Sequence, residues 1–258
     1  MRDLSLVFPA YNEEARLPAL LATLAGSAEE DLAGARLRLR EIVIVDDGSS
    51  DRTSELVSDA AVRDPRIRPL RPYSEHCGKG AALKAGIEAA TAELTLLADV
   101  DLSTPLSDAW RLSEAMREGG EPIAIGSRNV EGAMVIAPRY RRVLGAGFNL
   151  AVRALTGLRF ADTQSGLKLL ETGVARELVR EQLTPGFACD VELLLRARMA
   201  GHPVVEVPVS YVHDDGSKLR VAPSSVAMTR DVLRMSIRLR RAGRGGRRIR
   251  RLEGASRA

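Results

Sequence analysis

Aromatic residues are scarce in this 258-residue chain, in which four Phe, four Tyr and one Trp make up 3% of the sequence. Single-stranded nucleic acid is bound largely by stacking of bases on aromatic rings, so no nucleic-acid partner is expected. Cysteine is scarcer still. Cys77 and Cys189 lie 112 positions apart in no metal-ligand spacing, which supports neither a disulfide framework nor a zinc site. Reduced cysteines are typical of the cytoplasm.

Long apolar runs are also missing. The first run, Leu4–Phe8, is soon followed by Pro9 and the polar residues 12–14, so it is too short for the core of a signal peptide. No later run approaches the roughly 18 uninterrupted apolar residues of a membrane-spanning helix. We therefore expect a cytoplasmic protein that is soluble or bound peripherally to the cytoplasmic face of a membrane.

Positive charge is concentrated at one end of the chain. The net charge is +4, but residues 230–258 hold eleven Arg against two acidic residues, a local charge of +9 that leaves −5 for the remainder. We expect residues 223–258 to form an amphipathic helix and an Arg-rich tail that contacts anionic membrane lipid. The alternative is a packed last helix followed by a solvated tail. The apolar side of the helix would carry Val226, Val232, Leu233, Ile237 and Leu239.

Apolar runs alternate with helical patterns through the first half of the chain. A helix near Leu17–Leu24, with Asn12 as its N-cap, is predicted after the first strand. The repeated order of strand, polar turn and helix predicts an α/β fold, with a mostly parallel central sheet flanked by helices. Further on, Val204–Val212 alternates as a strand, and Pro208 within it favours the sheet edge. The predicted strands of the first half are Leu4–Phe8, Ile42–Val45, Ile67–Leu70, Leu94–Ala98 and Ile123–Ile125.

Polar clusters follow four of these predicted strands. Open α/β sheets bind ligands beyond the carboxyl ends of their strands. We therefore expect the clusters to converge on one rim, although they are far apart in the sequence. They are residues 9–13, 46–51, 99–101 and 127–128.

The strongest of these signals is the pair Asp99 and Asp101. Two carboxylates separated by one residue after a buried strand offer hard oxygen ligands to Mg²⁺ or Mn²⁺ shared with a diphosphate. The alternative is a solvated acidic turn, because so short a motif occurs often by chance. Lys79, flanked by two glycines at the start of a predicted helix, fits no Walker motif but suits an anion.

Taken together, the motifs resemble those of the inverting glycosyltransferases of family two. Within that family the pattern is most similar to dolichyl-phosphate and polyprenyl-phosphate glucosyltransferases, and it is also similar to the corresponding mannose synthases. The resemblance spans residues 4–221. The motifs that carry it are FPAYNEE (8–14), IVDDGSSDRT (44–53), GKGAALKAG (78–86), ADVDLSTP (98–105), IGSR (125–128), DTQSGLKL (162–169) and EVPVSYVHDDGSKLRV (206–221).

The resemblance implies a GT-A, Rossmann-like domain over residues 1–222, with a nucleotide-sugar half at 1–128 and an acceptor half at 129–222. It implies that Asp99 and Asp101 hold the cation and that Arg128 approaches the diphosphate or the acceptor phosphate. Residues expected to bind the nucleotide sugar are Pro9, Tyr11, Glu13, Asp46, Asp47, Lys79, Asp99 and Lys218.

The acceptor decides which further groups the reaction needs. A lipid monophosphate is already an anion and needs no strong base, whereas a hydroxyl needs a carboxylate to take its proton. Asp162 and Asp190 are the candidates for that base. Basic residues at Arg128, 139–142 and Lys218 favour a phosphate acceptor.

The expected function is metal-dependent transfer of glucose from UDP-glucose to a polyprenyl or dolichyl phosphate. Ser103 occupies the position at which many mannose synthases have Gln, which favours glucose over mannose as the transferred sugar. The alternatives are a GDP-mannose-dependent polyprenyl-phosphate mannosyltransferase and a glycosyltransferase for a soluble hydroxyl. A noncatalytic basic nucleotide or nucleic-acid binder is a further alternative, but it would not explain acidic clusters that repel phosphate.

Overall fold

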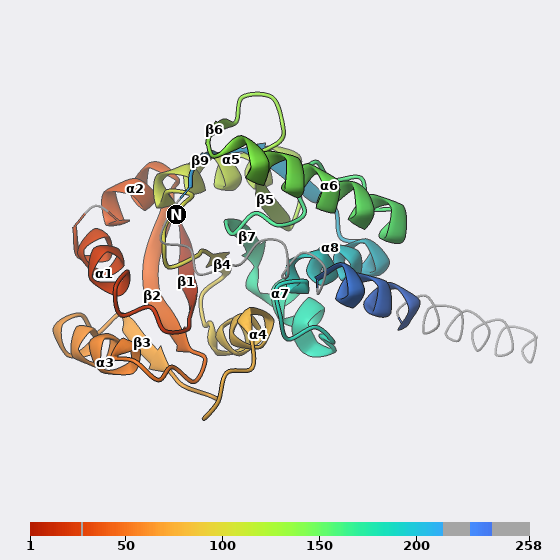
Figure 1. Cartoon of the computed structure of the whole chain (residues 1–258). Helices are drawn as coiled ribbons and strands as arrows, with labels where there is room; N and C mark the ends of the chain where they lie inside the picture. Colours follow the sequence, from red (N-terminus) through yellow and green to blue (C-terminus); the bar gives the residue numbers. More distant parts are fainter. Residues whose placement is uncertain (27, 214–227, 239–258) are drawn as a thin grey trace, which may run out of the picture.

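A computed structural model describes residues 1–26, 28–213 and 228–238 and has a central sheet between two layers of helices (Figure 1). The sheet has seven strands in the order β3-β2-β1-β4-β7-β5-β8. All neighbouring pairs are parallel except those of β7, which is antiparallel to both β4 and β5. The strands are β1 (Arg2–Ala10), β2 (Leu37–Asp46), β3 (Ile67–Leu70), β4 (Leu94–Leu97), β5 (Ile123–Ser127), β7 (Lys168–Glu171) and β8 (Val204–Pro208).

A separate two-stranded ribbon pairs β6 (Met134–Ile136) with β9 (Ser210–Val212) in parallel. The helices are α1 (Leu17–Ala25), α2 (Ala28–Gly34), α3 (Thr53–Arg63), α4 (Lys79–Ala89), α5 (Ala109–Gly119), α6 (Arg139–Thr156), α7 (Thr172–Arg180) and α8 (Cys189–Ala200), with a 3-10 turn at Leu106–Asp108. Among the described helices none is both long and apolar enough to cross a membrane.

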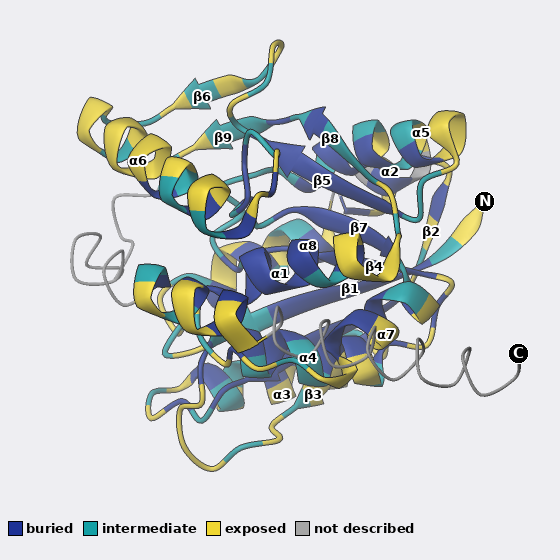
Figure 2. Cartoon of the chain, turned by 90° about the vertical axis from the view of Figure 1, so that its right-hand side faces the viewer, coloured by how far each residue is buried: buried dark blue, intermediate teal, exposed yellow. Residues whose placement is uncertain are grey.

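The core lies on both faces of the sheet, as the unbroken apolar strands require. Side chains alternate along β1, so that Leu6 and Phe8 pack beneath α1, α2, α3 and α5 while Val7 packs on the side of α4, α6, α7 and α8. Figure 2 shows the strands as the most deeply buried elements. The helical residues 228–238 join the second layer through Val232 and Met235.

Most predicted elements are present, and the GT-A-like α/β prediction is confirmed. The predicted strand Ile67–Leu70 has the same bounds in the structure, and the strand at Val204 lies at the sheet edge as expected. That strand ends at Pro208, however, so the last part of the predicted run belongs to the separate ribbon. Strand β7 was not predicted.

The prediction of Asn12 as a helix N-cap is wrong. Helix α1 begins at Leu17, five residues later, and the backbone of Asn12 has a φ of 54°. Asn tolerates this left-handed conformation better than most residues. Its side-chain oxygen accepts a hydrogen bond from the backbone N–H of Ser50, so it fixes the β1 loop to the β2 loop instead of starting a helix.

Candidate active site

One cleft of about 700 Å³ lies beyond the carboxyl ends of β1, β4 and β5 and is lined by residues from all of the predicted polar clusters. The predicted convergence is therefore confirmed. Three predicted residues are not part of its lining: Asp46 and Asp162 are buried, and Lys218 is outside the described residues. The predicted residues that line the cleft are Pro9, Tyr11, Glu13, Asp47, Lys79, Asp99, Asp101, Arg128 and Asp190.

An aromatic platform lies in the cleft wall formed by the loop after β1 and the segment before α4. Tyr11 stacks on His76 with ring centroids 3.8 Å apart and an interplanar angle of 25°. The buried carboxylate of Asp47 accepts hydrogen bonds from the backbone N–H groups of Cys77 at 3.0 Å and Gly78 at 2.7 Å, and His76 lies 2.8 Å from it. Asp47 thus fixes the loop before α4. The sequence did not single out His76, because nothing near it in the chain signals a partner 29 positions away.

Asp46 has a structural role in the same loop. Its carboxylate accepts a hydrogen bond from the backbone N–H of Ser49 at 2.9 Å and forms an ion pair of 3.3 Å with Arg71. Contact with a nucleotide sugar stays a prediction for this residue.

The acidic pair lies at the centre of the cleft. Asp99 follows β4, and its Oδ1 is 2.7 Å from the Nζ of Lys79 at the first turn of α4. Gly166 packs against the other oxygen so closely that a Cβ there would lie 2.1 Å from it. Asp101 accepts a hydrogen bond from the backbone N–H of Ser103 at 2.9 Å.

The charge state of Asp99 follows from these contacts. Partial removal of the carboxyl from water raises its pKa. The positive charge of Lys79, together with those of Lys168 and Arg128, outweighs this effect and holds the pKa below its ordinary value. Asp99 is therefore ionised at neutral pH, and the exposure of 40% of its side chain to water favours the same charged form.

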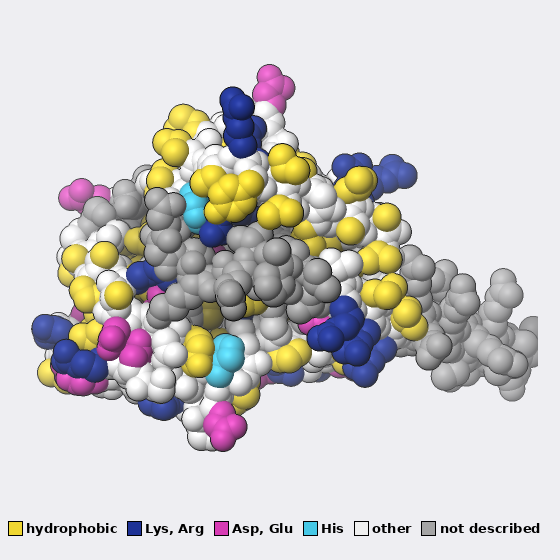
Figure 3. Space-filling view, in the orientation of Figure 1, with side chains coloured by type: hydrophobic (Ala, Val, Ile, Leu, Met, Phe, Trp, Pro, Cys, Tyr) yellow, Lys and Arg dark blue, Asp and Glu magenta, His cyan; other side chains and the backbone are white. Residues whose placement is uncertain are grey.

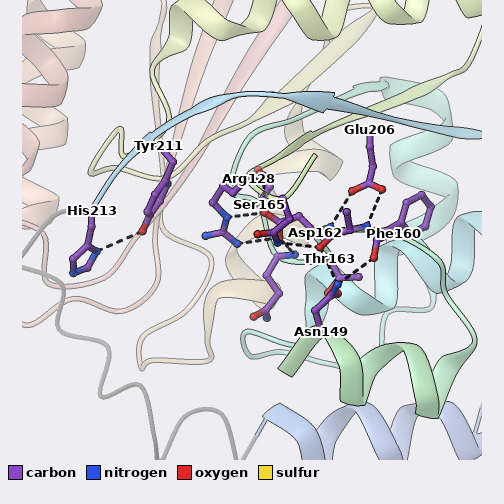
Figure 4. A network of polar contacts seen from close by, with 12 residues as sticks. Arg128, Asn149, Phe160, Asp162, Thr163, Ser165, Glu206, Tyr211 and His213 are labelled. Atoms are coloured by element: carbon purple, nitrogen blue, oxygen red, sulfur yellow. Dashed lines mark hydrogen bonds and ion pairs between the residues drawn. The ribbon is translucent and has the colours of Figure 1, made fainter. Parts of the chain in front are cut away.

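Arg128 forms a rigid cationic group on the opposite side. Its Nε and Nη2 donate to the two oxygens of Asp162 at 2.6 and 2.9 Å, a bidentate arrangement (Figure 4). The ring of Tyr211 lies beneath the guanidinium at 5.1 Å. Glu206 fixes the loop that carries Asp162, because its carboxylate accepts hydrogen bonds from the backbone N–H groups of Ala161 and Asp162. Arg128 is thus held in one orientation with its charge at the cleft.

The candidate bases Asp162 and Asp190 are both engaged in ion pairs. Burial raises the pKa of Asp162, but Arg128 outweighs it and the pKa lies below the ordinary range. Asp190 accepts a 2.6 Å hydrogen bond from Lys168, and the Nζ of Lys79 lies 3.9 Å from its other oxygen.

Lys168 is a residue that the sequence reasoning missed. It lies in β7 and is 1% exposed, and its ammonium also donates to the backbone carbonyl of Ser165. A Lys within an otherwise apolar strand was the available signal, because a buried ammonium requires a partner.

Comparisons with known proteins agree with this geometry. Residues 5–170 match Glycosyl transferase family 2. The chain is 34% identical over 243 residues to a dolichyl-phosphate beta-glucosyltransferase of Dictyostelium discoideum, an alignment that covers 91% of this chain and 74% of the relative. It is 31% identical to the dolichyl-phosphate beta-glucosyltransferase of Homo sapiens, with 92% and 76% covered.

The fold is similar to solved structures of a more distant protein. Glucosyl-3-phosphoglycerate synthase from Mycobacterium tuberculosis, in complex with Mn²⁺, uridine-diphosphate and phosphoglyceric acid, has a TM-score of 0.65 at 18% identity, with 91% of this chain and 77% of that chain covered. The complex with uridine-diphosphate has a TM-score of 0.63 at 19% identity, with 92% and 79% covered. At these identities the likeness concerns the fold alone.

Proposed function

The chain belongs to glycosyl transferase family 2 and is a glycosyltransferase, and we propose that it transfers glucose from UDP-glucose to a polyprenyl monophosphate such as dolichyl phosphate. Relatives that act on dolichyl phosphate, by their names, align over about nine-tenths of the chain. The structural observation that carries the proposal is a single cleft containing an acidic pair on one side and a fixed guanidinium on the other.

The acidic pair fits a divalent cation that is shared with the donor. Within the described residues no group of three or more His, Cys, Asp or Glu could hold a metal. Asp99 and Asp101 would hold the ion together with water and the donor diphosphate, as is usual for Mg²⁺. Asp101 has the more available carboxylate, since its only hydrogen bond in the described part of the chain comes from a backbone N–H. We propose Mg²⁺ or Mn²⁺ as the ion. When bound, it supplies positive charge that stabilises the departing diphosphate.

The protein's own cations would act on the same developing charge. Breaking the bond to the anomeric carbon leaves negative charge on the β-phosphate, and preorganised positive groups lower the barrier without reorganising. Lys79 and Arg128 are held in place by carboxylates before any ligand binds. We propose that Lys79 contacts the donor and that Arg128 lies between the donor diphosphate and the acceptor phosphate.

The ion pairs also favour an acceptor that needs no base. Asp162 is held by Arg128 and Asp190 by Lys168, so neither carboxylate is free to take a proton from a hydroxyl. A monophosphate attacks as an anion and leaves both pairs intact. Arg141, which lines the cleft at α6, adds positive charge on the acceptor side.

The proposal is tested by comparing acceptors and donors with the purified full-length protein. A short-chain prenyl phosphate should be glucosylated from UDP-glucose, whereas the matching prenyl alcohol and GDP-mannose should give at least 100-fold less product. Arg128→Ala should remove turnover, while Arg159→Ala, an exposed arginine outside the cleft, should not. Preference for the alcohol or for a soluble metabolite would overturn the proposal.

Two sequence-based expectations accompany this proposal. A cytoplasmic enzyme that binds a membrane peripherally would suit a lipid acceptor, and a division into donor and acceptor halves at residue 128 would suit a two-substrate cleft. The Arg-rich tail lies mostly outside the described residues, and its contact with lipid stays a prediction.

A further inference from the structure

Helix α6 has a face that no described part of the chain covers. Only Phe148, Val152 and Thr156 are buried, one residue per turn along a single stripe. Much of the rest is exposed, including Val143 at 70% and Leu150 at 68%. In Figure 2 this helix stands out as an exposed element beside the buried sheet.

The exposed apolar residues form a second stripe on the same helix. Four exposed apolar residues of α6 are separated by three, four or seven positions, so they lie on one side of the helix. They are Tyr140, Val143, Leu144 and Leu150. Small residues fill the gaps between them. A soluble helix normally presents polar residues on the side opposite its buried stripe, so this second apolar stripe requires another explanation.

The neighbouring ribbon extends this surface. In β6 and β9 the register places Ile136 opposite Val212, and Met134 points to the same side of β6 because strand side chains alternate. All three are more than half exposed. The intervening Tyr211 points to the other side and lines the cleft. The ribbon therefore has an apolar outer face and an inner face that belongs to the active site.

The charged residues of β6 and α6 are all basic. Residues 132–161 contain five Arg and no Asp or Glu. None of the five forms an ion pair anywhere in the described ranges, and Figure 3 shows apolar and basic side chains close together over α6. Two copies of the chain meeting through this surface would bring like charges together, which disfavours a symmetric dimer.

We propose that α6 and the outer face of the β6–β9 ribbon dock on an anionic phospholipid bilayer. The apolar stripe enters the headgroup boundary, and the arginines beside it contact lipid phosphates. Arg141 of the same helix lines the cleft, so docking brings the active site to the lipid surface. The link to a lipid acceptor rests on the proposed function, whereas bilayer binding itself does not.

A fluorescence experiment tests the contact at a single position. Tyr140→Trp is placed in a Trp110→Phe background, which removes the only other Trp. With vesicles of phosphatidylcholine and phosphatidylglycerol at 7:3, brominated lipids should quench this Trp by at least half. The matched control is Val62→Trp in the same background, because Val62 is 87% exposed on α3. The control should not be quenched.

A binding experiment tests whether the surface contributes affinity. The double substitution Val143→Glu and Leu150→Glu should lower the vesicle partition coefficient at least tenfold, and Val62→Glu should leave it unchanged. Measurement in 0.5 M salt weakens purely electrostatic binding, including any by the C-terminal tail, which all variants retain.

The outcomes separate docking from catalysis. The double variant should keep its activity on a short water-soluble prenyl phosphate. Absence of quenching in the Tyr140→Trp variant or undiminished vesicle binding by the double variant would overturn the docking proposal, as would a wild-type dimer that the double variant dissociates. Vesicle binding without transfer to any prenyl phosphate would instead leave docking intact and overturn the proposed function.

Discussion

The substitution Gly166→Ala tests whether the position of the Asp99 carboxylate controls catalysis. A Cβ at residue 166 would lie 2.1 Å from Asp99 Oδ2 and 2.7 Å from its Cγ. Ordinary contact begins near 3.4 Å, so the carboxylate has to move by more than 1 Å. Rotation about the Cβ–Cγ bond would move the oxygen but not Cγ, which also lies too close to the added Cβ. Asp99 therefore has to rotate about its Cα–Cβ bond, and this rotation lengthens its 2.7 Å ion pair with Lys79.

The expected effect is large on activity and small on stability. A misplacement of about 1 Å at a reacting centre costs on the order of 100-fold in rate, so kcat/KM should fall at least that far. The ion pair is partly exposed and contributes about 0 to 1 kcal/mol, which the reduced entropy of the unfolded chain with Ala offsets by about 0.4 to 1 kcal/mol. The free energy of unfolding should therefore change by less than about 1 kcal/mol.

The assay combines steady-state kinetics on UDP-glucose and a short prenyl phosphate with urea unfolding of the same preparation. Gly173→Ala is the matched control, because no atom lies within 4 Å of its added Cβ in α7. Wild-type kcat/KM in Gly166→Ala would refute the reasoning. A loss of several kcal/mol in stability would assign Gly166 to folding instead.

Two further predictions concern metal dependence and pH. Asp101→Asn should lower turnover at least 100-fold while the fold stays intact, and EDTA should do the same to the wild type; full activity in either case would contradict a metal site. Burial opposes ionisation of Glu41, but hydrogen bonds from Ser5, Thr91 and Arg68 outweigh it and lower its pKa from 4.5 to about 2. Glu41 therefore stabilises the fold above pH 4.5, and this contribution is lost as the pH falls towards 2. Relative to Glu41→Gln, the wild type should be more stable by about 2 kcal/mol at pH 7, after allowance for solvent screening, and the difference should shrink through that window in urea unfolding; a difference that does not change with pH would contradict the assignment.

Much of the fold could be predicted from the sequence because its strands are buried on both faces. Runs such as Ile42–Val45 are apolar without interruption, which leaves little ambiguity about their place in a parallel sheet. The polar ends of these strands then indicated the rim of the cleft. Strand β7 escaped prediction because it begins with a charged residue, Lys168, and directly follows a polar turn, so that only a short apolar stretch remains.

The hydrogen-bond and ion-pair partners of the site residues could not be predicted from the sequence for a different reason. Lys168 and Asp190 are 22 positions apart, and Asp47 meets backbone groups 30 and 31 positions away. Local periodicity and spacing carry no information about such pairs. Asn12 was misassigned because an Asn before acidic residues has the same local pattern whether it caps a helix or binds a neighbouring loop.

The ion pairs on the cleft floor explain how a site for two anionic substrates can fold before either binds. Three cations and three carboxylates are joined there in a chain of four groups and a separate pair. Removing one partner of a buried pair leaves a charge that costs several kcal/mol. Activity lost on substitution of the buried carboxylates Asp162 or Asp190 therefore has to be read against the free energy of unfolding. Asp101 differs, because no described residue forms an ion pair with it, so its substitution reports on the chemistry more directly than that of Asp99. The chain runs from Asp99 through Lys79 and Asp190 to Lys168, and the separate pair is Arg128 with Asp162.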